Sequence, residues 1–118
     1  MGYLIVGLGG AFGSVVRFMI GRRLSETSNN WMPAGTFFIN ISGAILLGII
    51  SSINIDGNLY LLLGDGFLGA YTTFSTFMYE GFNLFKEEGK KNAYTYITGT
   101  FLFGIIGFII GVEIVKLF

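Results

Sequence analysis

An uncharged stretch at residues 33–53 is long enough to cross a lipid bilayer as one helix. A helix needs about 20 mainly apolar residues for that crossing. Three other apolar segments lie along the chain, each with one or two charged residues near its ends. The sequence therefore predicts four transmembrane helices, at about residues 2–20, 33–53, 59–84 and 94–115.

The composition agrees with a chain whose solvent is lipid. Of the 118 residues, 53% are hydrophobic and only 12% are charged, against about 25% charged in a typical soluble domain. A soluble domain of this size exposes too much of its surface to hide so much apolar material. The runs are also too continuously apolar for transmembrane β-strands, which alternate apolar and polar residues. We therefore expect a single all-α membrane domain over residues 1–118.

The reactive side chains limit the chemistry. There is no Cys and no His, which excludes thiolate catalysis, Ser-His-Asp triads, zinc sites with nitrogen or sulfur ligands, and disulfides. Seven basic and seven acidic residues balance, and no basic patch favours nucleic acid. No paired base and nucleophile is visible, so an enzyme is not expected.

The third segment holds the densest cluster of polar and flexible residues. Glycines at positions 64, 66 and 69 precede four hydroxyl residues within residues 72–76. Gly and β-branched Thr weaken a helix, and non-helical backbone at membrane depth is tolerated only inside protein or beside a wet cavity. The pattern favours a functional break near the middle of the third helix. The alternative is a continuous helix whose hydroxyls bond carbonyls four residues back.

Asn40 lies near the middle of the second segment, on the same helix face as Thr36 and Gly43. A buried amide is costly unless it is hydrogen-bonded. Two interpretations remain open: a polar contact that joins two helices, or a donor that lines a polar pathway.

Phe74 and Phe77 are three residues apart and share a helix face. Such rings usually pack in the core or face lipid. A ring edge, however, carries positive electrostatic character and can face an anion without a formal charge. Together with the amide and the hydroxyls, the rings indicate a narrow path for an anion.

The basic residues predict how the chain inserts. Four crossings place both termini on one side of the membrane and the first and third loops on the other. The terminal side carries only Lys116, whereas the two loops carry Arg22, Arg23, Lys86, Lys90 and Lys91. By the positive-inside rule, the loops face the cytoplasm and the termini face outward.

Three motifs carry a resemblance to a known family. Residues 9–17 read GGAFGSVVR, residues 35–43 read GTFFINISG, and residues 66–77 read GFLGAYTTFSTF. With these motifs the chain resembles, over essentially its whole length, the Fluc-type (CrcB family) fluoride channels. These are small bacterial plasma-membrane proteins that let fluoride leave the cytoplasm and so lower its toxicity.

The resemblance implies roles for particular residues. Fluoride would pass through pores lined by amide, hydroxyl and phenyl groups, those of Asn40, Phe74, Ser75, Thr76 and Phe77. Arg17 would lie in an aqueous vestibule that attracts anions. A structural sodium ion would be held at the break by the backbone carbonyls of Gly69 and Thr72.

The resemblance also implies an antiparallel dimer of four-helix subunits with two separate pores. Two positions depart from the family's pattern: Asp65 stands where an uncharged residue is expected, and Ala70 where a glycine is expected. Dual insertion of one polypeptide goes with nearly balanced Lys and Arg counts, and this chain is strongly biased. Its partner is therefore expected to be either a second copy or a related subunit of opposite topology.

Two other functions are alternatives to a channel. A small multidrug-type exporter needs a titratable carboxylate in its first helix, where this chain has only Arg17. A non-transporting subunit of a membrane assembly would explain the glycines. It gives no reason for hydroxyls, an amide and paired phenyl rings to coincide.

Overall fold

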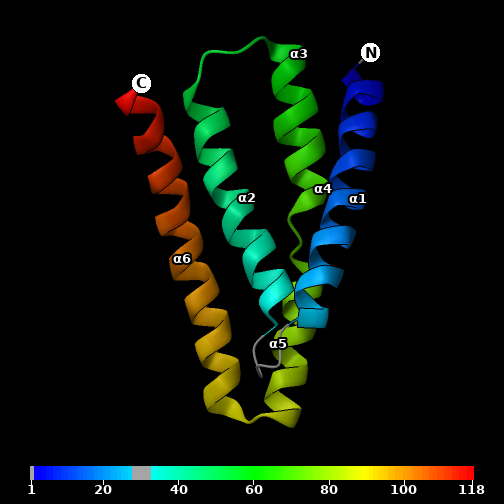
Figure 1. Ribbon diagram of the computed structural model, residues 1–118, viewed down its shortest axis with the longest axis vertical. Coiled ribbons are helices and arrows are strands. Elements are labelled where there is room, and N and C mark those ends of the chain that lie inside the picture. The colour runs from blue at the N-terminus through cyan, green and yellow to red at the C-terminus, as the bar shows by residue number, and fades with distance from the viewer. Residues whose placement is uncertain (1, 28–32) are drawn as a thin grey trace.

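The computed structural model describes residues 2–27 and 33–118, which form helices and turns with no β-strand in those ranges (Figure 1). The long helices are α1 (Gly2–Thr27), α2 (Ala34–Ser52) and α6 (Lys90–Leu117). Shorter helical elements occupy the chain between α2 and α6: α3 (Gly57–Tyr60), the π-helix η1 (Leu61–Leu68), α4 (Gly69–Tyr71) and α5 (Ser75–Glu87).

The long helices match three of the predicted membrane crossings. Within the described residues, three stretches are helical, long and apolar enough to span a bilayer: Gly2–Leu24, Ala34–Ser52 and Lys90–Leu117. The segment at residues 59–84, for which the sequence favoured a break, is divided into several elements. The elements α3, η1 and α4 follow one another directly, and α5 begins only after an extended residue at Thr72.

Glycines bring the helices into backbone contact. Helix α1 packs along η1, where a Cβ on Gly9 would collide with the carbonyl oxygen of Leu62. Helix α2 packs along α6, where a Cβ on Gly111 would collide with the carbonyl oxygen of Ile45. Small residues of this kind let helices associate in lipid, where no hydrophobic effect draws them together. Helix packing is thus the role of these glycines.

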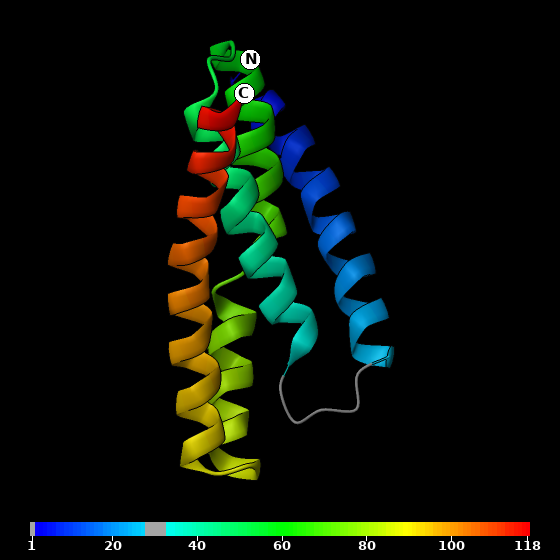
Figure 2. The same ribbon diagram turned by 60° about the vertical axis from the view of Figure 1, so that its left-hand side comes forward.

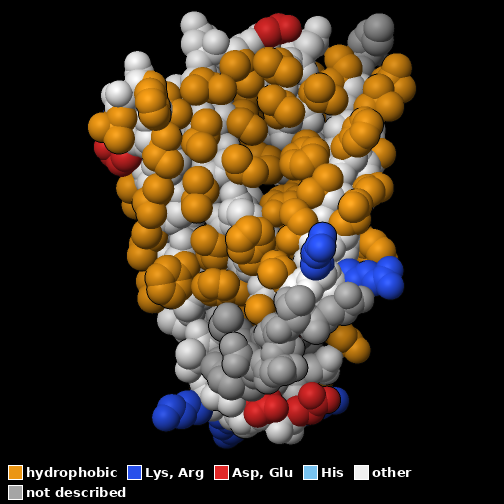
Figure 3. All heavy atoms as spheres, viewed as in Figure 1, with side chains coloured by type: hydrophobic (Ala, Val, Ile, Leu, Met, Phe, Trp, Pro, Cys, Tyr) orange, Lys and Arg blue, Asp and Glu red, His pale blue; other side chains and the backbone are white. Residues whose placement is uncertain are grey.

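Large apolar side chains cover the outside of the molecule (Figure 3). Phe12 and Phe18 on α1 are 66% and 65% exposed. The buried interior is small by comparison, with one cluster formed by Ile39, Leu68 and Tyr71. Apolar exposure on this scale is far beyond that of a soluble monomer, and it suits a protein surrounded by lipid.

Both chain ends lie at one end of the bundle, and the turn between α5 and α6 lies at the other (Figures 1 and 2). The two views agree that α5 and α6 run side by side. The Lys and Arg side chains visible in Figure 3 lie in the half away from the termini. This arrangement matches an even number of crossings with the basic loops on the opposite side.

Two helices extend into polar sequence beyond the predicted crossings. Helix α1 continues to Thr27, and the turn between α5 and α6 consists of Glu88 and Gly89. Gly89 has a φ of 93°, a conformation that glycine adopts without steric cost. Charged residues are good helix formers once the chain reaches water. The polar residues therefore indicate where the chain leaves the apolar segment, but they do not indicate where the helix ends.

Candidate functional site

The candidate site centres on the interruption between α4 and α5. Helix α4 ends at Tyr71, Thr72 is extended with φ −77° and ψ 157°, and α5 begins at Ser75. The Thr72 hydroxyl donates to the carbonyl oxygen of Leu68 at 2.9 Å. Thr side chains that bond nearby backbone offer it an alternative to helical pairing, which is a local reason for the helix to stop here.

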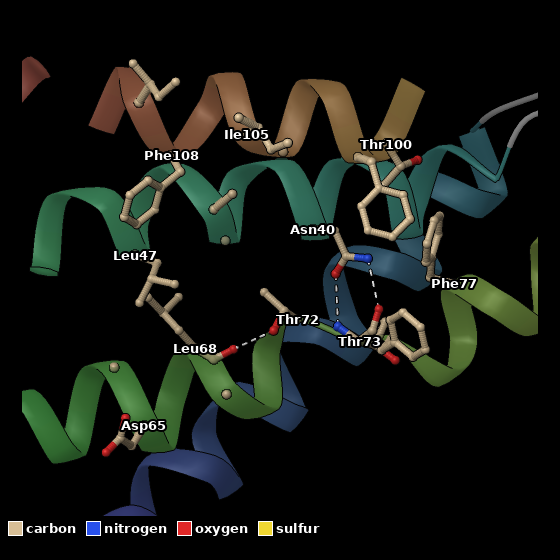
Figure 4. A pocket seen from close by; sticks show the side chains of 18 of the residues that line it. Asn40, Leu47, Asp65, Leu68, Thr72, Thr73, Phe77, Thr100, Ile105 and Phe108 are labelled. Atoms are coloured by element: carbon tan, nitrogen blue, oxygen red, sulfur yellow. Dashed lines mark hydrogen bonds between the residues drawn. The ribbon is translucent and has the colours of Figure 1, made fainter. Parts of the chain in front are cut away.

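Asn40 of α2 holds the interrupted backbone in place (Figure 4). Its Nδ2 donates to the carbonyl oxygen of Thr73 at 2.9 Å, and its Oδ1 accepts from the Thr73 N–H at 2.9 Å. The side chain thus replaces the helical partners of both backbone groups. One N–H of the Asn40 amide remains outside this pair, since the amide nitrogen carries two.

Two neighbours of Asn40 on α2 bring the helix close to the break. A Cβ on Gly43 would collide with Cγ2 of Thr72, so only glycine allows this approach. The Ser42 hydroxyl lies 2.8 Å from the hydroxyl of Tyr71 and forms a hydrogen bond with it. Residues 40–43 therefore dock on the end of α4 through both shape and polar contacts.

A cavity of about 840 Å³, here called the large cavity, lies between α2 and α6 on one side and the η1–α4 segment on the other (Figure 4). Most of its lining is apolar, and Asn40 and Thr100 add polar groups. Phe74 and Phe77 line it, with ring centroids 6.2 Å apart in an edge-on arrangement. Phe77 is 3% exposed, whereas Phe74 is 67% exposed.

A second cavity of about 340 Å³, here called the basic cavity, lies against the other side of the break. Arg17 and Arg22 of α1 line it, together with Thr36, Thr76 and Glu80. The Thr36 hydroxyl donates to a carboxylate oxygen of Glu80 at 2.5 Å. The lining thus combines two guanidinium groups with one carboxylate.

The structure brings most of the predicted site residues together, in two groups. The large cavity is lined by Asn40, Gly69, Thr72, Phe74 and Phe77. The basic cavity is lined by Arg17 and Thr76. Ser75 is exposed and belongs to neither lining. The role expected for its hydroxyl remains a prediction.

Asp65 and Ala70, the two departures from the family's pattern, lie on different faces. Asp65 is exposed and borders the large cavity. Ala70 faces α1, where a Cβ on Gly10 would make an ordinary contact with the Ala70 methyl at 3.8 Å. The extra methyl of Ala70 is thus accommodated in the α1–η1–α4 packing.

Three contributions were not foreseen from the sequence. Thr73, which is 8% exposed, meets Asn40 through its main chain. Tyr96 is 1% exposed, packs on Phe77 with ring centroids 5.3 Å apart, and its hydroxyl has no hydrogen-bond partner among the described residues. Thr100 borders the large cavity. The uneven hydroxyl content of α6 was a signal for the last two, but only packing shows which hydroxyls face inward.

The break also leaves main-chain oxygens available for a cation. In a continuous helix the Thr73 N–H would bond the carbonyl of Gly69, but here it bonds Asn40. The Gly69 carbonyl thereby loses its helical partner, and both Gly69 and Thr72 border the large cavity. Hard cations prefer oxygen ligands of this kind. No cluster of three or more acidic side chains offers a different metal site within the described ranges.

These features define a multi-pass α-helical membrane protein with a polar interruption between two cavities. The model of the family described as CrcB-like protein, Camphor Resistance (CrcB), matches residues 4–112, and the chain belongs to this family.

Relatives from three bacteria are similar over nearly their whole length. A protein of Clostridium acetobutylicum named fluoride-specific ion channel FluC 2 is 55% identical over 111 residues, which cover 94% of this chain and 95% of the relative. Proteins of the same name from Moorella thermoacetica and Bacillus cereus are 41% and 39% identical. They cover 90% and 94% of this chain, and 89% and 94% of their own lengths. The chain is thus a multi-pass protein of the bacterial cell membrane.

Proposed function

We propose that this protein is a fluoride-specific ion channel that lets fluoride leave the cytoplasm by passive permeation. Support comes from the family, from relatives named fluoride-specific ion channels, and from the site. The observation that carries the proposal is the break held by Asn40, which lies between an arginine-lined cavity and a mainly apolar one. Such a channel supplies a path and no chemical step, so it is not an enzyme.

Fluoride is small and strongly hydrated, so a selective path must replace its water with donors at short range. In our proposal the free N–H of Asn40 and the hydroxyls of Ser75 and Thr76 supply these donors, and Phe74 and Phe77 present ring edges. The edge-on pairing of the two rings supports this arrangement. Since Ser75 is exposed in the single chain, its contribution requires a surface completed by another subunit.

Arg17 is the vestibule residue of this proposal. It lines the basic cavity with Arg22, and a positive cavity with low-dielectric walls raises the local concentration of an anion. The same cavity contains Glu80, whose carboxylate is engaged by Thr36. In this proposal Arg17 attracts the anion, and Thr36 holds the Glu80 carboxylate in place.

We also propose a structural sodium ion at the break. The carbonyl oxygens of Gly69 and Thr72 would hold it, and the lost helical partner of Gly69 supports that assignment. The ion would neutralise the exposed carbonyl ends and fix the interruption. It supplies no step in permeation.

The proposed assembly is an antiparallel dimer with two pores. Exposed apolar side chains border the large cavity, including Phe74 and Phe101 at 67% and 54%, and a second subunit would cover them. The bias of the basic residues favours a related subunit of opposite topology over a second copy. A topology reporter on the C-terminus of the chain expressed alone tests this choice, because equal signals on both sides of the membrane would support a homodimer.

Fluoride efflux from liposomes that contain the purified protein tests the function. We expect fluoride to leave rapidly and chloride to remain. Liposomes that stay sealed to fluoride, both with the chain alone and with a co-expressed related subunit, would overturn the proposal.

A further inference from the structure

Thr73 occupies a position that no other residue in the described part of the chain shares. It is the only described residue that lines both the large cavity and the basic cavity. It is 8% exposed and lies in the non-helical segment between α4 and α5. Thr73 is thus the residue at which the two linings meet.

The polar groups of Thr73 are engaged in a particular pattern. Its N–H and its carbonyl oxygen are both bonded to Asn40 at 2.9 Å, which fixes the main chain. Its Oγ1 accepts from the N–H of Thr76 at 3.3 Å, in the first turn of α5. The hydroxyl proton is donated to no described residue, so it remains available to a ligand.

We propose that Thr73 is the transfer point between the two cavities, and that its hydroxyl donates to fluoride as the ion passes from the basic cavity to the large one. This inference rests on the proposed function. The ion would first be attracted by Arg17, would then accept a hydrogen bond from the Thr73 hydroxyl, and would next accept one from the free N–H of Asn40. The roles are coupled because Asn40 also holds Thr73 in place.

The position of α5 favours an anion at this point. Its N-terminus begins two residues after Thr73, and the N-terminal end of a helix carries partial positive charge. The Thr73 Oγ1 takes up one N–H of that first turn, which orients the hydroxyl proton away from the helix. An ion beside Thr73 would thus meet a donor that the helix end keeps oriented.

Two substitutions separate the hydroxyl from the shape of the side chain. Thr73→Val keeps the branched shape and removes the hydroxyl, whereas Thr73→Ser keeps the hydroxyl and removes the methyl. We expect fluoride efflux from liposomes to fall about tenfold or more in Thr73→Val, as for the loss of one hydrogen bond to an ion. Thr73→Ser should stay within about threefold of the parent protein on the same reasoning. Equal rates for Thr73→Val and the parent, or equally slow rates for both variants, would overturn the proposal.

A third variant separates ion transfer from the contact with α5. Thr73 stands one position before the N-cap residue Phe74. Thr73→Asp keeps an acceptor for the Thr76 N–H but has no proton to donate, and its charge repels an anion. It should slow fluoride efflux at least about tenfold. Efflux at the parent rate would show that Thr73 serves only as an acceptor for the first turn of α5, and would overturn the proposal even if Thr73→Val does not fold.

A matched control is Thr98→Val on α6, since Thr98 is exposed and lines neither cavity. Its efflux should equal that of the parent. Parent protein that carries no fluoride would overturn the proposed function itself. Parent protein that carries fluoride while Thr73→Val does so equally well would overturn only the role of Thr73.

Discussion

Helix α2 makes two contacts of opposite character. Along α6, glycine lets the two backbones touch, as Gly111 does against Ile45. Against the break, Asn40 bonds the main chain of Thr73 with both ends of its amide. The first contact depends on the absence of a side chain and the second on the chemistry of one. Close packing and the bonding of an interrupted backbone are therefore separable roles of the same helix.

The difference has a physical cause. Two continuous helices satisfy their own backbone groups, so only close van der Waals contact is left to hold them together in lipid. An interrupted helix leaves N–H and C=O groups that must find partners at membrane depth. The Asn40 amide bonds both the N–H and the carbonyl of Thr73, and its second N–H lies outside this pair. Where the backbone is broken, polar groups accumulate, and that accumulation is what an ion path requires.

The largest expected effect tests the packing side of this comparison. Gly111→Ala places a methyl group against the carbonyl oxygen of Ile45, which cannot move without shifting α2. We expect the free energy of unfolding to fall by about 3 kcal/mol, at the upper end of overpacking effects. Thermal unfolding in detergent measures it. Gly99→Ala on the same helix is the control, because a Cβ there meets nothing within 4 Å among the described residues. If Gly99→Ala and Gly111→Ala gave the same unfolding curve, close packing at Gly111 would not explain the loss of stability.

The next effect tests the polar side. Asn40→Ala removes both hydrogen bonds to Thr73 and the free donor, so fluoride efflux should fall about a hundredfold, from the loss of charge-assisted and buried hydrogen bonds. Liposome efflux measures the change. Asn58→Ala, an exposed amide outside both cavities, is the control. Unchanged efflux in Asn40→Ala would show that Asn40 contributes only to helix packing and not to permeation.

The smallest expected effect concerns the rings. Phe77→Ile keeps an apolar side chain but removes the ring that lines the large cavity, and we expect fluoride efflux to fall about tenfold, within the range of single aromatic contacts. Because Phe77 also packs on Tyr96, Tm must be recorded for the same sample. Phe12→Ile, on an exposed part of α1, should leave efflux unaltered, and a similar loss there would point to a general effect of ring removal.

Much of the fold was open to prediction because its determinants are local. The positions of α1, α2 and α6 follow from runs of apolar residues that match the thickness of a bilayer. The run at residues 59–84 was long enough for the same prediction, and its Gly and Thr content indicated where continuity would fail. The structure ends α4 at Tyr71 and starts α5 at Ser75, inside that cluster. The helix ends were less predictable, since α1 continues to Thr27 on residues that suit both a helix and water.

The site was predictable in part, for a reason that its residues make plain. The importance of Asn40 could be inferred because an amide at that depth needs a partner. The identity of the partner could not, because Thr73 lies 33 positions away and its main chain meets Asn40 only through the packing of α2 against the break. Ser75, expected beside the path, is exposed.

The sequence by itself determined that this protein is helical and lies in a membrane, because apolar length and the scarcity of charge act on each segment separately. It also determined that polar groups concentrate in the second and third segments. Only the tertiary structure decided which of those groups meet. Asn40 reaches Thr73 because Gly43 lets α2 approach Thr72, and the division into two cavities at Thr73 follows from that approach. Contacts between distant segments depend on how whole helices pack, and no single stretch of sequence contains that information.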